Sequence, residues 1–175
     1  GLHEGTGKGT VVGLRQQTSD AITYANLAVS SAKAGNLSEA QTYAGQTINI
    51  IEGSGGSNYD ASWGDVGDKY GILAYAADVN THAAAAMSAA PNDSTINTYG
   101  PRVVDSGANV STWATQARDD AWDARNTSSA LVTQLYMLNA SALLTKALNG
   151  YDADSDGTIE AITGEGGASQ AYVAA

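Results

Sequence analysis

Among the residues of this chain that could do chemistry, three aspartates at alternate positions near the carboxyl end have the most specific spacing. They precede Gly157 in the run YDADSDGTIE at 151–160. Calcium takes six to eight oxygen ligands. One short loop can supply them from side chains at alternate positions and from a backbone carbonyl, and a glycine allows the chain to turn around the ion. The run therefore predicts a calcium site. Its predicted ligands are the side chains of Asp152, Asp154 and Asp156, the carbonyl of Thr158, and Glu160.

These residues resemble the calcium-binding loops of EF-hands and dockerins over about ten positions. Counted from Asp152, glycine falls at the sixth position, and Ile159 falls at the eighth, where the resemblance implies a contact with the core. Thr163 falls at the twelfth position, where those loops carry a bidentate acid, so Glu160 or Glu165 would have to complete the shell. We therefore expect weak calcium binding, with a dissociation constant on the order of 10⁻⁴ to 10⁻³ M. The alternative is a solvated acidic turn, although uncompensated repulsion among three aspartates disfavours it.

A second acidic stretch lies in the glycine-rich segment 53–68. Asp60, Asp65 and Asp68 stand there among glycines that can turn a backbone around an ion, which makes them a weaker second cation site. Their spacing is not alternate. The other interpretation, which we favour, is an ordinary connection in which Asp68 caps the next helix.

The two histidines, His3 and His82, define an alternative class of function. A periplasmic metal-binding or redox accessory protein would use both of them. Helical spacing places His82 on an inward face, where a lone histidine is more often a hydrogen-bonded core residue than a ligand. The glycine-rich run at 5–10 is no phosphate loop, because its Gly-Lys pair is followed by glycine instead of Ser or Thr. Residues 1–10 are therefore expected to be a flexible lead-in.

Composition and charge exclude several classes of partner. The chain has 175 residues, 43% of them hydrophobic, and a net charge of −10 with eight basic residues. Nucleic acid and anionic membrane surfaces attract clustered Lys and Arg, so neither is an expected partner. The absence of cysteine excludes disulfides and thiolate metal sites. No apolar run approaches the roughly 20 residues that cross a bilayer, so no membrane insertion is expected.

Helical periodicity recurs along the chain and predicts an all-α fold. The length suits one domain over 1–175, an antiparallel bundle of four to five helices with a calcium-type loop at 150–167. Small residues at heptad spacing from Val103 to Ala124 predict a closely packed seam, with Trp113 and Trp122 beside it against a neighbouring helix or a partner. The predicted helices cover 11 to about 34, a second segment that follows the turn at 35–40 and ends at Gly53, about 69–89, a segment with Pro101 in its first turn, about 129–149, and a short stretch from about Ala168.

Low lysine content, abundant small polar residues and a calcium loop together favour an exported protein. Five Asn-x-Ser/Thr sequons, an excess over chance that suggests glycosylation, begin at Asn36, Asn92, Asn109, Asn126 and Asn139. No nucleophile elbow, paired acid and base, or other catalytic constellation is present, so we expect no enzyme. The expected function is an exported calcium-binding module with a structural, cell-surface or assembly role. Its expected partner is a second copy of the chain or another surface protein.

Overall fold

The fold is entirely helical over the residues that the computed structural model describes, 7–175, and no β-strand occurs among them. This confirms the all-α prediction. None of the helices in this part of the chain combines the length and apolar character needed to cross a membrane. The helices are α1 (Thr10–Lys33), α2 (Leu37–Glu52), the 3-10 turn η1 (Ala61–Trp63), α3 (Ile72–Ala89), α4 (Ser94–Asn126), α5 (Ala130–Asn149) and α6 (Ala168–Ala174).

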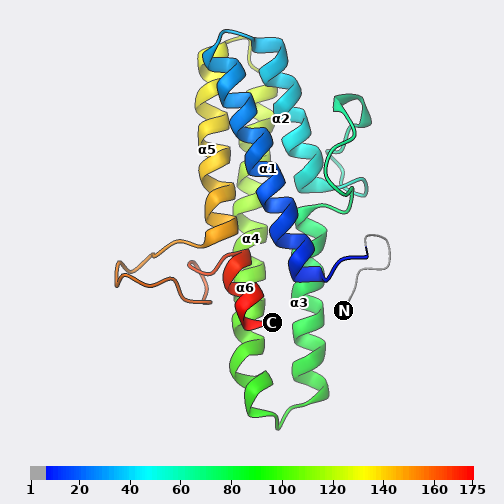
Figure 1. Cartoon of the computed structure of the whole chain (residues 1–175), viewed down its shortest axis with the longest axis vertical. Coiled ribbons are helices and arrows are strands. Elements are labelled where there is room, and N and C mark those ends of the chain that lie inside the picture. Colours follow the sequence, from blue (N-terminus) through cyan, green and yellow to red (C-terminus); the bar gives the residue numbers. More distant parts are fainter. Residues whose placement is uncertain (1–6) are drawn as a thin grey trace.

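Four of the helices pack side by side, and neighbours run antiparallel (Figure 1). α1 packs between α2 and α5, and α4 closes the ring by packing against the same two helices. α4 has 33 residues, which corresponds to a length of about 50 Å, so it extends beyond the ring. α3 packs beside this extension, and α6 returns onto α4 near the start of α1.

The contacts between helices are made largely by alanine and glycine, as the predicted seam requires. All the predicted α4 seam residues, from Val103 to Ala124, are buried. Large side chains fill the space that glycines leave open: a Cβ built on Gly13 would lie 2.3 Å from the Tyr75 ring, and one on Gly45 would lie 2.6 Å from Trp63. Small residues therefore allow close approach, and a few aromatic residues complete the packing.

The periodicity predicted that the third helix begins at Lys69, but it begins at Ile72. Lys69 has φ 67° and Gly71 has φ 95°, so the backbone is left-handed just before the helix and cannot continue it. Asp68 does not cap α3. Its carboxylate accepts hydrogen bonds from the Tyr70 amide (3.1 Å) and the Tyr75 hydroxyl (2.8 Å).

The fourth helix begins at Ser94, so the prediction that Pro101 occupies its first turn is wrong. The Asp93 carboxylate accepts hydrogen bonds from the amides of Thr95 and Ile96, which satisfies two orphan donors at the true amino end. Pro101 lies inside the helix, where it donates no hydrogen bond to the carbonyl of Asn97.

Replacing Pro101 with alanine is expected to raise the free energy of unfolding by about 1–3 kcal/mol, because an interior proline loses one helical hydrogen bond and crowds the preceding turn. Urea unfolding followed by circular dichroism measures the change. Unchanged or reduced stability would show that α4 bends at this residue to fit its neighbours.

Candidate metal centre

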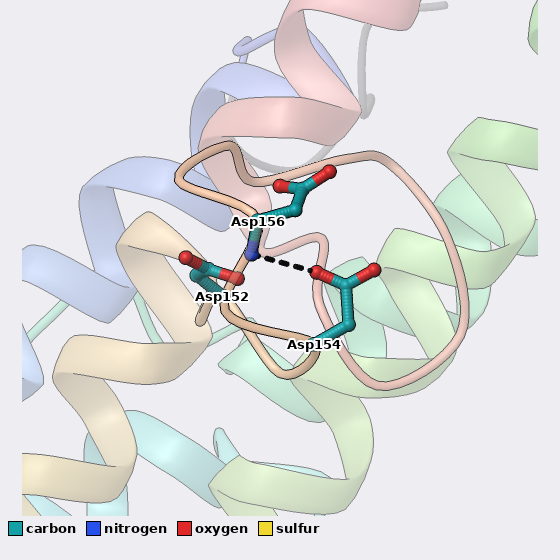
Figure 2. Close-up of side chains that lie close together, drawn as sticks. All are labelled: Asp152, Asp154 and Asp156. Atoms are coloured by element: carbon teal, nitrogen blue, oxygen red, sulfur yellow. Dashed lines mark hydrogen bonds between the residues drawn. The ribbon is translucent and has the colours of Figure 1, made fainter.

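The three aspartates of the 150–167 loop come together on one turn between α5 and α6 (Figure 2). One carboxylate oxygen from each of Asp152, Asp154 and Asp156 lies within 4.8 Å of the others. Oxygens that share a calcium ion at 2.3–2.6 Å can be at most about 5 Å apart, so this spacing is compatible with one ion. No other group of three acidic or histidine side chains with such spacing occurs among residues 7–175.

Hydrogen bonds from the loop's own backbone hold the turn. Asp152 accepts the amides of Ser155 (2.7 Å) and Gly157 (3.0 Å), and Asp154 accepts the amide of Asp156 (3.1 Å). Ser155 (φ 64°) and Gly157 (φ 93°) are left-handed, which curls the chain around the carboxylates. A carboxylate has about four lone-pair sites, so these bonds leave oxygen sites for a cation.

Thr158 and Glu160 lie at the edge of this cluster. The Thr158 hydroxyl contacts the carboxylates of both Asp156 and Glu160, and one hydroxyl proton cannot serve two ionised carboxylates. The other Glu160 oxygen is buried and has no hydrogen-bond partner. The Thr158 bond lowers the pKa of Glu160, but the adjacent Glu165 carboxyl, burial and Asp156 outweigh it and raise that pKa. This crowding of acids is what a bound cation would relieve.

Glu165, which the sequence offered only as one of two residues to complete the shell, forms the inner support of the loop. It is 2% exposed, and its carboxylate accepts the amides of Ala153, Asp154 and Glu160 at 3.2–3.4 Å. The adjacent Glu160 carboxyl, and then the hydrogen bonds from the backbone amides of Glu160, Ala153 and Asp154, lower the pKa of Glu165 despite its burial. Both oxygens of Glu165 therefore accept hydrogen bonds from the backbone of the 150–167 loop.

Asn109 of α4 fastens the returning half of the loop, and sequence reasoning missed this role. Its amide nitrogen donates to the carbonyls of Ile162 (2.7 Å) and Gly166 (3.0 Å), and its oxygen accepts the Gly164 amide (2.8 Å). Asn109 is only 7% exposed. Its side-chain nitrogen is buried and donates both of its hydrogen bonds to the loop, which disfavours a glycan at this sequon.

Ile159 does not make the contact with the core that the resemblance implied. It is 38% exposed, and its side chain lies against the backbone of Gly150. Gly150 is left-handed (φ 79°), and a Cβ there would lie 2.5 Å from the Ile159 side chain. The loop is therefore attached to the bundle mainly by the polar contacts of Asn109, together with a bond from Thr163 to Asp105 (3.0 Å).

The three acids of the weaker second site do not come together. Asp60 accepts the Ser62 amide (2.8 Å) at the start of η1, and Asp65 pairs with Lys69 (3.0 Å). Asp68 contacts Tyr70, Tyr75 and Lys8. Protein groups hold this segment in place, because the backbone of Asp60 also exchanges two hydrogen bonds with the side chain of Asn49. The acids form no cation cluster there.

His82 belongs to no metal cluster among residues 7–175. His3 lies outside the described residues. His82 is exposed, so the prediction that it faces the core is wrong. α3 and α4 extend together beyond the ring of four helices, and His82 lines an apolar hollow of about 650 Å³ beside this pair. The other residues around it there include Val79, Tyr99 and Tyr172.

The arrangement in the 150–167 loop can bind a hard cation through oxygen atoms and offers no paired nucleophile and base. Comparison of the chain with protein-family models, with curated proteins and with solved structures finds no match.

Proposed function

We propose that the chain is an exported calcium-binding helical module with a structural, cell-surface or assembly role. In this proposal the ion fastens the 150–167 loop, and with it α6, onto the helices. The observation that carries it is the meeting of Asp152, Asp154 and Asp156 within 4.8 Å. The unpartnered buried oxygen of Glu160 beside this cluster adds to the support.

The donor set favours calcium over other metals. Every candidate ligand is an oxygen, which suits hard cations and not zinc or copper. Magnesium requires near-ideal octahedral geometry at 2.0–2.1 Å, whereas calcium accepts flexible geometry and longer bonds. Asp154 and Asp156 are exposed, so protein atoms do not enclose their carboxylates in a tight octahedral cage, which suits the less demanding ion. Glu165 cannot replace the missing twelfth-position acid without giving up its bonds to the loop amides, so we keep the expectation of weak affinity.

A bound ion would act on the fold through charge. Without a cation, four acids within nine residues repel one another, and a divalent ion converts these repulsions into shared attractions. The same segment is bonded to Asn109 and supported by Glu165, and it leads directly into α6. Binding to the folded state alone adds to stability, so calcium would act as a clamp on the carboxyl end.

We propose export because of the composition of the chain and the weak calcium affinity expected of the loop. A loop with weak affinity functions where calcium is abundant, which is the case outside cells. The low lysine content and the sequons that remain open to solvent, such as Asn92, agree with that location. The expected partner is a second copy or another surface protein.

About 10 mM calcium is expected to raise the melting temperature, and chelator is expected to reverse the rise. With a dissociation constant on the order of 10⁻⁴ to 10⁻³ M, one-site binding adds about 1.4–2.7 kcal/mol, or roughly 3–10 °C for a chain of this size. The double substitution Asp154→Ala with Asp156→Ala should abolish the response and leave the helical content of the calcium-free protein nearly unchanged. Differential scanning calorimetry and circular dichroism measure both.

The matched control is Asp65→Ala with Asp123→Ala, which removes two exposed acids elsewhere and changes the net charge equally. It should keep the full response to calcium. A wild-type melting temperature that ignores calcium and chelator, or a double variant of the loop that still responds, would show that this loop is not the site.

A further inference from the structure

A second hollow in the surface is lined by residues of α4, of α6 and of the returning half of the 150–167 loop, which lie together in Figure 1. Its volume is about 410 Å³, which falls in the range of small-molecule sites. Ile159 and Ile162 of the loop and Val173 of α6 give it apolar walls, and they are 38%, 45% and 85% exposed. Arg102 of α4 also lines it, and we call it the Arg102 hollow.

Arg102 brings a positive charge that the protein itself does not use. Its guanidinium forms no ion pair with any of residues 7–175, whereas that of Arg118 pairs with Glu52 and Asp119. It lies over the ring of Tyr99, 5.4 Å from the ring centre. Stacking on a ring occupies the flat face of a guanidinium and leaves its in-plane N–H groups free, and these match the two oxygens of a carboxylate.

We propose that the Arg102 hollow binds a small carboxylic acid with an apolar body. The carboxylate pairs with Arg102, and the body lies against Ile159, Ile162 and Val173. The volume equals that of about fourteen water molecules, which suits a ligand of roughly a dozen heavy atoms. A single negative charge fits better than a phosphate monoester, because Glu160 lines the same hollow and would repel the nearly two charges of a phosphate more strongly.

Calcium should strengthen this binding, and this part of the inference rests on the proposed function. Residues 159–162, which line the hollow, directly follow the cluster of Asp152, Asp154 and Asp156. Without an ion, these acids repel an incoming carboxylate, and a divalent ion cancels two of their charges. Two charges at a distance of about 10 Å in water change an affinity roughly fourfold at low salt. By linkage, the ligand should tighten calcium binding by the same factor.

Titration of the isotope-labelled protein with 3-phenylpropionate, followed by two-dimensional NMR in about 10 mM calcium and low salt, tests the site. A ligand of about eleven heavy atoms should bind with a dissociation constant on the order of 10⁻³ M. The largest shifts should fall in residues 159–162 and 169–174, which line the hollow. 3-Phenylpropanol, which lacks the charge, and acetate, which lacks the apolar body, should each bind roughly fivefold more weakly.

Substitutions distinguish the Arg102 hollow from general attraction to positive charge. Arg102→Gln should weaken 3-phenylpropionate roughly fivefold, and Ile162→Ala roughly threefold. Arg102 is exposed, so the melting temperature of its variant and the response of that temperature to calcium should be preserved. The matched control is Lys33→Gln, which removes one exposed positive charge at the carboxyl end of α1 and should leave the affinity unchanged. Equal weakening by Arg102→Gln and Lys33→Gln, equal binding of 3-phenylpropanol, or no saturation by about 20 mM would overturn the proposal.

The same titration in chelator-treated, dialysed protein tests the link to calcium. Wild-type affinity should fall roughly fourfold. Asp154→Ala with Asp156→Ala, which removes two of the repelling charges, should bind without calcium as tightly as the wild type binds with it. If the loop binds no calcium, the melting shift is absent and the affinity ignores calcium, but the loss in Arg102→Gln persists and supports the ligand site. If the melting shift is present and the affinity still ignores calcium, the coupling is wrong.

Discussion

Replacing Asn109 with alanine is expected to lower the free energy of unfolding by about 3 kcal/mol, the largest loss from any polar side chain near the loop. The change removes three hydrogen bonds at once and leaves the carbonyls of Ile162 and Gly166 and the amide of Gly164 without their partner. Such groups each cost about 1–3 kcal/mol when they stay buried and unsatisfied. For a chain of this size the loss corresponds to roughly 6–12 °C in melting temperature.

Thermal melting and amide hydrogen exchange measure the global and the local parts of this loss. Exchange should increase most in residues 150–175, because Asn109 makes three of the hydrogen bonds that join this segment to α4. Asn126→Ala is the control: its side chain is exposed and bonds only to the Trp122 carbonyl of the same helix. Similar losses in the two variants would show that Asn109 contributes helix stability and does not fasten the loop.

The existence of the helices could be predicted from the local sequence pattern. The ends of a helix could be predicted only where nearby residues determine them. The seam of α4 and the start of α6 at Ala168 were predicted correctly, since small-residue periodicity and a glycine run are visible in the chain. The start of α4 was missed because Pro101 looked like a first-turn residue, although Asp93 supplies the actual cap. The exposure of His82 was missed because periodicity shows which face a residue shares, but not where α3 extends beyond its neighbours.

The candidate site divides in the same way. The aspartate cluster could be predicted because its three carboxylates lie within five residues of one another in the sequence. Its support could not, because Asn109 reaches the loop from more than 50 residues away and its Asn-Val-Ser context suggested a glycosylation site. One signal was available: Glu165 is the single acid in the glycine run GEGG at 164–167. Glycine-rich backbone can wrap around a buried carboxylate and donate amides to it, as it does here.

Two neighbouring glutamates are expected to respond to substitution in opposite directions in calcium-free protein at neutral pH. Glu165→Gln should lower the melting temperature by several degrees. Its side-chain NH₂ group would face a backbone amide that now donates to a carboxylate oxygen. Glu160→Gln should raise the melting temperature slightly, because the raised pKa of Glu160 means that its charged form is disfavoured in the fold. Glu160→Gln should also weaken the response to calcium.

The pH dependence of calcium-free protein distinguishes these two roles. The pKa of Glu165 is lowered by folding, so its stabilising contribution is present above its unfolded pKa and is lost as pH falls through the lower folded value. The pKa of Glu160 is raised, so its unfavourable contribution is present at neutral pH and is relieved as pH falls through that higher value. As pH falls from 7 to about 3, protonation of Glu160 should therefore first raise the wild-type melting temperature, and protonation of Glu165 should then lower it. Glu160→Gln should remove the gain and Glu165→Gln should reduce the loss. If both variants follow the wild-type profile throughout, the pair does not set the acid response, and Glu165 supports the loop by packing alone.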